Sequence, residues 1–432
     1  MNLINMRKAL LVLLILVGGA ACQAPRPRLI LISVDGLWAG DLRRAESAGV
    51  RLAVFDSLRR AGALAEGVIG SLPSVTYPSH TTMITGVPPA RHGVYGNRIF
   101  TPPTDSIEHS YARRVEIQVP TVFDAAHAAG LKVAAVFWPV SANDPNLDYN
   151  IPDAWDQTGK VSQLEALRSL GTPWLLDTLG APATGSPNDS LLVLWAEQIL
   201  HRWNPDLLAL HVLALDGAKH DYGVWNDSVI RVLRTLDGQL GALLAAVRAT
   251  DAGRQTTVVV TSDHGFLNHE RIFRPGVLLA KAGLVRADRA GHVTVWEAAV
   301  LLSGGNVMLH GRGLVDTGFV ARVRRAIPDS LIGPGRPIRA VWGRDTIAAL
   351  GGDPRALWAL DLNDGFYSGG GYTGAVLSEG RGGGHGYDPR RRELHAFFLI
   401  SGPGVPAGTA RPLMRQTEVA GILARILSLK GF

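Results

Sequence analysis

Short apolar runs alternate with longer amphipathic stretches along most of this chain of 432 residues. The apolar runs lie at residues 29–34, 133–137, 207–213, 257–261 and 396–400, and each has the length and composition of a buried strand. Helical patterns lie between them, for example at residues 190–203 and 228–249. This alternation predicts an α/β fold in three layers, with a mostly parallel central sheet between two layers of helices.

Two segments interrupt the alternation. Residues 142–188 are rich in Asp, Asn, Pro and Gly and show no clear strand pattern. Residues 270–378 mix short strands with Gly and Pro, which predicts an insertion or cap within one domain that spans residues 22–432. Ligands of open α/β sheets bind beyond the carboxyl ends of the strands. We therefore expect the reactive side chains to follow the strands directly.

The first 21 residues have the pattern of an export signal. Basic residues at positions 7 and 8 precede an apolar run at 9–17 and small residues at 18–21. The run is short for a helix that crosses a bilayer, so an uncleaved anchor is the alternative. We expect an exported protein that is periplasmic, anchored at the cell envelope or secreted.

Cys22 is the only cysteine, and it lies where cleavage of the signal would fall. Its surroundings resemble the lipobox of bacterial lipoproteins, although Gly19 stands where that pattern favours leucine. Membrane attachment through lipidated Cys22 and ordinary cleavage after Ala21 or Ala24 both remain open. In either case the mature chain has no disulfide and no cysteine-based zinc site. Any metal would be bound by His and carboxylate side chains.

The charge of the chain does not indicate binding to nucleic acid. The formal net charge of +6 becomes +4 when the two basic residues of the signal are removed, and the remaining excess is spread along the sequence. A weak positive excess of this kind is compatible with a small anionic substrate.

Potential metal ligands follow three of the predicted strands, and a glycine-rich loop adds one more. They are Asp35 in ISVDG, Asp216 and His220 in LALDGAKH, Asp263 and His264 in VVVTSDHG, and His385 in RGGGHGYD. Three Asp and three His are a suitable donor set for two divalent ions bound through nitrogen and oxygen. A single Asp after a strand often caps a helix, so each segment alone is a weak signal. The occurrence of all of them in this order favours metal binding.

Residues 71–86, SLPSVTYPSHTTMITG, place Thr76 near the start of a predicted helix. Pro78 suits a first helical turn, where free N–H groups and the helix dipole favour an anion. A threonine oxygen bound to zinc at this place would lose its proton more easily and could attack phosphorus. On the local pattern alone, however, a capping role for Thr76 is the simpler interpretation.

The ordered set of Asp35, the TYPSH segment, Asn97, D-x-x-x-H, DH and the late histidine resembles the alkaline phosphatase superfamily. Within it, the chain is most similar to the nucleotide pyrophosphatase/phosphodiesterase family, also called type I phosphodiesterases. The likeness runs from residue 29 to the end and includes FWPVS at 137–141 and FFLISGPGV at 397–405.

The resemblance implies two Zn²⁺ per chain and assigns their ligands. One zinc would be bound by Asp216, His220 and His385, and the other by Asp35, Asp263, His264 and the oxygen of Thr76. It also implies that Thr76 is the nucleophile and forms a phosphothreonine intermediate. Asn97, 21 residues after Thr76, would contact a phosphoryl oxygen.

The resemblance to this family defines the substrate less well. Monoesterases of the superfamily that use threonine have a Ser-x-Lys-x-Arg segment, which is missing after Asn97, so a phosphate diester is favoured. In members that cleave nucleotides, an aromatic residue after the nucleophile and a tyrosine five residues before D-x-x-x-H enclose the base. Here these positions hold Tyr77 and His211. We expect both to contact a small diester or nucleotide, and we expect His80 to have a structural role.

Two other classes of function remain open. The same bimetallic site could serve a phosphomonoesterase or a hydrolase similar to phosphonoacetate hydrolase. The chain could also be a surface protein that binds metal without catalysis, which the presence of Thr76 together with all six metal ligands argues against.

Overall fold

A computed structural model describes residues 27–104, 109–155, 159–250, 256–313 and 315–431. The predicted export signal and Cys22 lie outside the described residues. None of the helices in the described ranges is long and apolar enough to cross a membrane.

An eight-stranded sheet forms the centre of the molecule, in the order β18-β2-β17-β7-β1-β6-β4-β5. Its strands are β1 (Arg28–Val34), β2 (Ala63–Ala65), β4 (Val133–Pro139), β5 (Tyr149–Asp153), β6 (Leu207–Val212), β7 (Thr256–Thr261), β17 (Phe398–Ser401) and β18 (Thr409–Arg411). β1 pairs in parallel with both β6 and β7, and β4 pairs in parallel with β5 and β6. β17 is antiparallel to its neighbours β2 and β7. The prediction of a mostly parallel sheet is confirmed.

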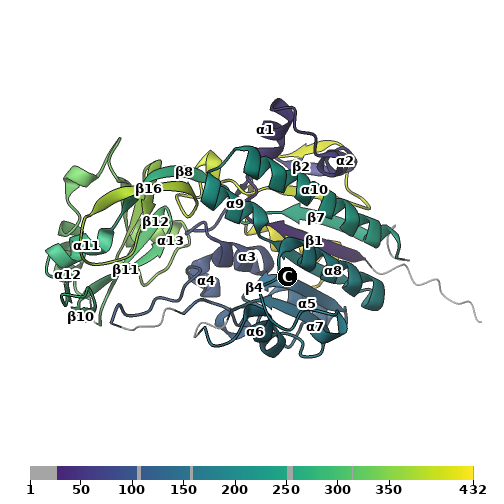
Figure 1. The fold of residues 1–432 in the computed structure, drawn as a ribbon, viewed down its shortest axis with the longest axis horizontal. Coiled ribbons are helices and arrows are strands. Elements are labelled where there is room, and N and C mark those ends of the chain that lie inside the picture. Colours follow the sequence, from purple (N-terminus) through teal and green to yellow (C-terminus); the bar gives the residue numbers. More distant parts are fainter. Residues whose placement is uncertain (1–26, 105–108, 156–158, 251–255, 314, 432) are drawn as a thin grey trace, which may run out of the picture.

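Helices cover both faces of this sheet (Figure 1). Successive residues of a strand point to opposite faces, so Ile30 and Ile32 of β1 pack on one side and Leu29 and Leu31 on the other. The first pair joins a core built with α2 (Ala53–Ala61), α6 (Gln163–Leu170), α7 (Leu175–Thr178), α8 (Asp189–Trp203) and α10 (Asp227–Arg248). The second pair joins a core built with α3 (Thr76–Thr85), α5 (Val122–Ala128) and α14 (Glu418–Ile426). The predicted three-layer arrangement is therefore also confirmed.

The segment at 142–188, predicted to contain no strand, contains β5 together with α6 and α7. The prediction was wrong because β5 has the polar-looking sequence YNIPD. Pro152 lacks an N–H group and is tolerated here because β5 is an edge strand. All five residues of β5 are buried, since neighbouring helices cover the strand.

The chain forms a smaller lobe between β7 and β17, drawn in green at the left of Figure 1. One of its sheets has the order β15-β8-β16, from β15 (Gly365–Ser368), β8 (Leu267–Phe273) and β16 (Leu377–Gly384). A second has the order β11-β12-β14-β13, from β11 (Ala298–Ser303), β12 (Asn306–Gly311), β14 (Trp358–Leu362) and β13 (Ile338–Gly343). A hairpin of β9 (Val285–Ala287) and β10 (Val293–Trp296) and the helices α11 (Pro275–Lys281), α12 (Thr317–Arg325) and α13 (Arg344–Ala349) complete it.

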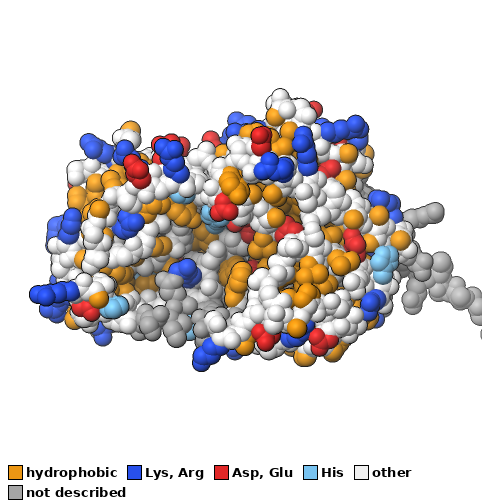
Figure 2. Space-filling view, in the orientation of Figure 1, with side chains coloured by type: hydrophobic (Ala, Val, Ile, Leu, Met, Phe, Trp, Pro, Cys, Tyr) orange, Lys and Arg blue, Asp and Glu red, His pale blue; other side chains and the backbone are white. Residues whose placement is uncertain are grey.

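The remaining elements are short connections, most of them around the main sheet. They are α1 (Asp41–Ser47), α4 (Pro89–His92), α9 (Ala214–Tyr222), β3 (Val68–Ile69), β19 (Met414–Arg415) and the 3₁₀ turns Arg114–Glu116, Asp329–Leu331 and Arg392–Leu394. Figure 2 shows that the surface is hollowed between the two lobes. A cleft of about 520 Å³ lies there, and residues of both lobes line it.

Candidate active site

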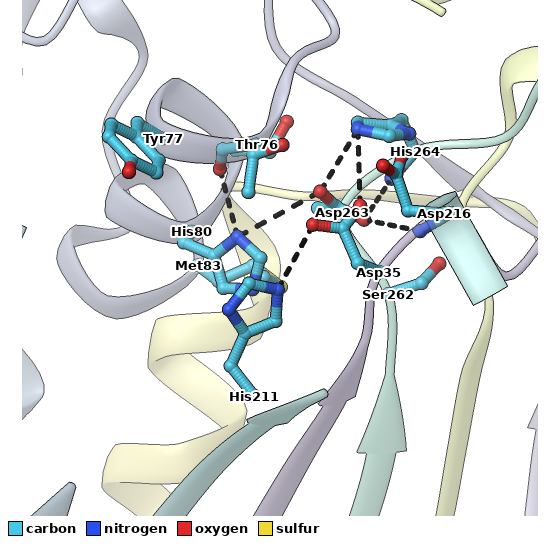
Figure 3. A network of polar contacts seen from close by, with 12 residues as sticks. Asp35, Thr76, Tyr77, His80, Met83, His211, Asp216, Ser262, Asp263 and His264 are labelled. Atoms are coloured by element: carbon cyan, nitrogen blue, oxygen red, sulfur yellow. Dashed lines mark hydrogen bonds and ion pairs between the residues drawn. The ribbon is translucent and has the colours of Figure 1, made fainter. Parts of the chain in front are cut away.

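Three carboxylates meet at the carboxyl ends of the three central strands (Figure 3). Asp35 directly follows β1, Asp263 follows β7 after Ser262, and Asp216 lies in the first turn of α9, which follows β6. Since β1 lies between β6 and β7 in the sheet, the three side chains are brought together. The structure thus places these residues where the strand pattern predicted them.

One cluster of donor atoms is formed by Asp35, Asp263 and His264, which offer atoms within 4.8 Å of one another. His264 Nε2 lies 3.0 Å from Asp263 Oδ2 and 3.5 Å from Asp35 Oδ1. All three side chains are buried. This is the group that the resemblance assigned to one metal together with Thr76.

A second cluster combines Asp216, His385 and again His264. His220 lies at its edge, with Nε2 3.2 Å from His385 Nε2 and 3.5 Å from Asp216 Oδ2. The rings of His264 and His385 are stacked, with centroids 3.6 Å apart. The two clusters are therefore contiguous, and His264 lies between them.

These side chains fit divalent metal ions. Five of their buried atoms have no hydrogen-bond partner, namely Asp35 Oδ1, Asp216 Oδ1, Asp263 Oδ2, His264 Nδ1 and His264 Nε2. An unpaired buried polar atom is costly, so a group of such atoms that converge calls for a cation. Burial and the neighbouring charges of Asp263 and Asp216 raise the pKa of Asp35 well above its usual range. A bound cation would relieve this repulsion, and imidazole with carboxylate is the donor set that zinc takes without cysteine.

The turn after Asp35 depends on glycine. Gly36 has φ +70°, and its N–H donates to Asp263 Oδ1 at 3.0 Å. A Cβ atom at this position would lie 2.6 Å from the ring of Phe266. Glycine therefore allows the chain to turn sharply and to link the two carboxylates.

The loop that carries His385 contacts the segment just before α3 and the smaller lobe. His385 Nδ1 lies 3.2 Å from the Ser74 carbonyl oxygen, and the His385 carbonyl accepts the N–H of Gly305 at 2.8 Å. Gly386 has φ +92°, and a Cβ there would lie 1.8 Å from the Ser303 carbonyl oxygen. The glycines around His385 thus permit close packing of the loop against β11.

Thr76 is the first residue of α3 and is 8% exposed. Its carbonyl lies 2.8 Å from His80 Nδ1, and the same nitrogen lies 3.9 Å from Asp263 Oδ2. Figure 3 shows Thr76 at the helix start beside the carboxylates. The structure therefore brings Thr76 to the metal-ligand cluster, and His80 has the buried structural environment that was expected.

Asn97 is fixed against the same helix start. Its Oδ1 accepts the N–H of Tyr77 at 2.9 Å, which uses one free donor of the first turn of α3. Asn97, His220 and His385 line the cleft between the lobes. Because Oδ1 is engaged, the amide Nδ2 is the part of Asn97 that can donate to a bound oxygen.

The comparison with known sequences decides the family. Residues 29–388 match the sequence profile of "Type I phosphodiesterase / nucleotide pyrophosphatase". The chain belongs to this family. The resemblance stated from the motifs is therefore confirmed.

Several characterised members of the type I phosphodiesterase family are similar to part of the chain. Human ectonucleotide pyrophosphatase/phosphodiesterase family member 1 is 25% identical over 244 residues, which are 55% of this chain and 23% of the human protein. Venom phosphodiesterase 2 of Crotalus adamanteus is 26% identical over 254 residues, 57% of this chain and 28% of its own length. The bis(5′-adenosyl)-triphosphatase of Xenopus laevis is 25% identical over 259 residues, 57% of this chain and 49% of its own length. The matches thus span about a quarter to a half of these relatives.

Solved structures of the family share the fold. Murine ectonucleotide pyrophosphatase/phosphodiesterase 5, in an inactive variant in complex with AMP, superposes with a TM-score of 0.67 at 18% identity. The match covers 94% of this chain and 96% of the murine chain. A second structure of the murine protein gives a TM-score of 0.66 over the same shares.

The prediction that His211 contacts a base is wrong for this member of the family. His211 is fully buried, and its Nε2 lies 3.1 Å from Asp35 Oδ2. Its Nδ1 lies 3.1 Å from the Phe137 carbonyl oxygen. With both nitrogens engaged and no exposed surface, the ring cannot stack on a ligand, and it instead supports Asp35.

Trp155 lies beside Tyr77 and was missed in the sequence. The indole N–H of Trp155 donates to the Tyr77 hydroxyl at 3.4 Å. Tyr77 is only 6% exposed, whereas Trp155 is 47% exposed. The two residues are far apart in the sequence, and a single Trp in a polar segment gives no periodic signal. An exposed indole next to the residue that follows Thr76 is the aromatic surface available to a ligand on this side.

Proposed function

We propose that this chain is a two-zinc phosphodiesterase/nucleotide pyrophosphatase that cleaves phosphate diesters with Thr76 as the nucleophile. The observation that carries the proposal is the convergence, beside the first residue of α3, of buried carboxylate and imidazole atoms that have no hydrogen-bond partner. Membership of the type I phosphodiesterase family supports the same function.

In this proposal, Asp35, Asp263, His264 and the Thr76 oxygen hold one zinc ion, and Asp216, His220 and His385 hold the other. The stacking of His264 on His385 supports a short separation between the two sets of ligands. When bound, two such ions polarise the attacking and the leaving oxygens of an in-line displacement.

The residues of the chain then carry out defined steps. Thr76 loses its hydroxyl proton to solvent, and its oxygen forms a bond to phosphorus while the ester bond on the opposite side breaks. The Asn97 amide donates to a non-bridging oxygen, and the N-terminus of α3 favours the negative charge on the phosphoryl group. Water then cleaves the phosphothreonine and regenerates Thr76.

A diester is favoured over a monoester because few cationic side chains reach the site. Lys219 follows Asp216 on α9, but its side chain is buried and donates to the Gly36 carbonyl and to Asp41. Among the described residues that line the cleft, Arg98 is the one Lys or Arg. A monoester has one more negative charge than a diester and would need additional cations. A monoesterase or a phosphonoacetate-hydrolase-like enzyme on the same ligands is the alternative.

A nucleotide is a suitable occupant of the aromatic side of the site. Trp155 offers an exposed ring beside Tyr77, and stacking of a base on such a ring contributes about 1–3 kcal/mol. The murine structure in complex with AMP and the Xenopus triphosphatase support this assignment by analogy.

The chemistry can be tested on the purified protein loaded with zinc. We expect two zinc ions per chain by elemental mass spectrometry and faster hydrolysis of bis-p-nitrophenyl phosphate than of p-nitrophenyl phosphate. Single-turnover quenching with acid, followed by peptide mass spectrometry, should trap phosphate on Thr76. A preference for the monoester of about tenfold in kcat/KM would contradict the diesterase assignment, and phosphate on another residue would contradict the role of Thr76.

Export is part of the proposal, because residues 7–21 have the order of basic, apolar and small residues that export signals use. The mature protein would then reside in the periplasm, at the envelope or outside the cell. The mass of the N-terminal peptide of the mature protein would distinguish a lipidated Cys22 from cleavage after Ala21 or Ala24.

A further inference from the structure

The cleft between the lobes lies on one side of the metal-ligand clusters. His220 and His385 are the predicted metal ligands that line it, while Tyr77 and Trp155 are not part of its wall. The rest of the wall comes from Val75, from Asn97 and the segment after it, and from the smaller lobe. The site therefore has two distinct sides, an aromatic side and a cleft side.

The cleft lies on the side that an in-line displacement assigns to the leaving group. The attacking oxygen belongs to Thr76, which lies beside Asp35 and Asp263. The departing oxygen must lie on the opposite side of phosphorus, and a second metal near His220 and His385 would receive it. Since these two histidines open onto the cleft, the leaving group would extend into it.

Part of the cleft wall carries hydroxyl groups. Ser303, Tyr367 and Ser368 contribute such groups. The Ser368 hydroxyl oxygen is buried and has no hydrogen-bond partner, and the side chain is only 8% exposed. The phenolic O–H of Tyr367 can donate a hydrogen bond at neutral pH.

Tyr367 is held rigidly at this position. Its ring stacks on His269 with centroids 4.7 Å apart and an interplanar angle of 15°. A Cβ on Gly384 would lie 2.4 Å from the ring, and one on Gly304 would lie 2.9 Å from the hydroxyl oxygen. The backbone on both sides therefore encloses the phenol, and its hydroxyl is presented beside the His385 loop.

The cleft wall also carries large side chains with apolar surface. Phe100, Val300, Leu302 and Tyr372 are among them, and Arg98 is the one Lys or Arg among the described residues of the wall. Pyrophosphate carries several negative charges, which need charged donors when they are withdrawn from water. A wall of hydroxyl and apolar groups is poorly suited to that ion.

We propose that this cleft is a leaving-group subsite for an uncharged alcohol that has both hydroxyl oxygens and apolar surface. The inference rests on the proposed function and specifies which diesters the enzyme prefers. In the reaction, the Thr76 oxygen forms its bond to phosphorus, the phosphorus–oxygen bond to the alcohol breaks, and the departing oxygen takes a proton from water. Tyr367 is a positioning residue that donates to an oxygen of this alcohol.

Two substrates that yield the same product test the inference on the zinc-loaded full chain. Thymidylyl-(3′→5′)-thymidine and thymidine 5′-triphosphate both release thymidine 5′-monophosphate, but one loses thymidine and the other pyrophosphate. We expect kcat/KM to be at least about tenfold higher for the dinucleotide, although pyrophosphate is the intrinsically better leaving group. Equal rates, or faster release from the triphosphate, would overturn the inference.

Variants separate the subsite from the metal centre. Tyr367→Phe should lower kcat/KM for the dinucleotide about tenfold and change that for the triphosphate less than about twofold. Leu302→Lys places a cation in the cleft wall and should raise triphosphate hydrolysis about tenfold. Tyr149→Phe, a matched change at a buried tyrosine outside the cleft, should alter neither rate. An equal effect of Tyr367→Phe on both substrates would show that Tyr367 has no role toward the leaving group.

Hydrolysis of bis-p-nitrophenyl phosphate distinguishes a failure of the leaving-group subsite from a failure of the proposed function. Hydrolysis of this diester by the wild type without a preference for the dinucleotide would overturn the subsite and leave the proposed function standing. Failure of zinc-loaded wild type on all three substrates would contradict the proposed function, and the subsite with it.

Discussion

His211 Nε2 lies 3.1 Å from Asp35 Oδ2, and neither side chain is accessible to solvent beyond a few per cent. The other ring nitrogen faces the Phe137 carbonyl at 3.1 Å. The orientation of the ring and that of the carboxylate are therefore tied together. Asp35 Oδ1, which has no hydrogen-bond partner, is directed toward His264. A residue that contacts a metal-binding side chain and fixes its orientation in this way strengthens metal binding.

Replacement of His211 by alanine would remove this support. We expect His211→Ala to lower zinc affinity at the Asp35 cluster by about 10- to 100-fold, because Asp35 Oδ2 loses its contact with the imidazole and the carboxylate can rotate. Zinc retained per chain during titration with a chelator would measure the change. His211→Gln keeps a polar group and should lose less. Equal zinc retention in wild type and His211→Ala would show that Asp35 is oriented without His211.

Asn97 offers two functions that different substitutions can separate. Asn97→Asp keeps an oxygen to accept the Tyr77 N–H but replaces the amide donor by a negative charge, so kcat/KM should fall by at least about 10²-fold while the melting temperature changes little. Asn97→Ala also loses the acceptor and should lower stability by about 1 kcal/mol. Diesterase rates and thermal unfolding of both variants would test this. Near-normal activity of Asn97→Asp would exclude contact between the amide and the phosphoryl oxygen.

The parts of the site that depend on order along the chain could be predicted from the sequence. Asp35 and Asp263 follow apolar runs that form β1 and β7, and the carboxyl ends of parallel strands meet at one edge of a sheet. Thr76 was placed at a helix start because Pro78 suits the first turn. These signals are local, and tertiary structure did not alter them.

The parts that depend on burial or on distant contacts could not be predicted. His211 lies in a strand and looks the same in sequence whether its ring faces a ligand or Asp35. The position of Trp155 beside Tyr77 and that of Tyr367 beside the His385 loop arise from packing between separate segments. β5 was missed because its polar residues are buried by helices that the sequence pattern of the strand does not show.

Lys219 and Asp41 form a buried ion pair that holds the loop after β1. Lys219 also donates to the Gly36 carbonyl at 2.8 Å, so it fixes the turn next to Asp35. Lys219→Met leaves Asp41 buried without its cation and should lower the free energy of unfolding by about 3–5 kcal/mol. The double variant with Asp41→Asn should recover part of this loss, because the unpaired charge is removed. Urea unfolding would measure both, and a loss below about 0.5 kcal/mol in Lys219→Met would show that the pair is not needed for stability.

Thr76 provides the strongest test of the reaction, because its substitution separates catalysis from metal binding. Thr76→Ala removes the attacking oxygen but leaves all six Asp and His side chains of the two clusters. We expect kcat to fall by at least about 10³-fold while the chain retains two zinc ions. Thr76→Ser keeps an oxygen at the start of α3 and should retain a measurable part of the activity.

Phosphodiesterase rates and zinc content, determined on the same samples, would test both expectations. If Thr76→Ala kept the wild-type rate, the nucleophile would be another group, and if it lost zinc together with activity, the effect would be on metal binding.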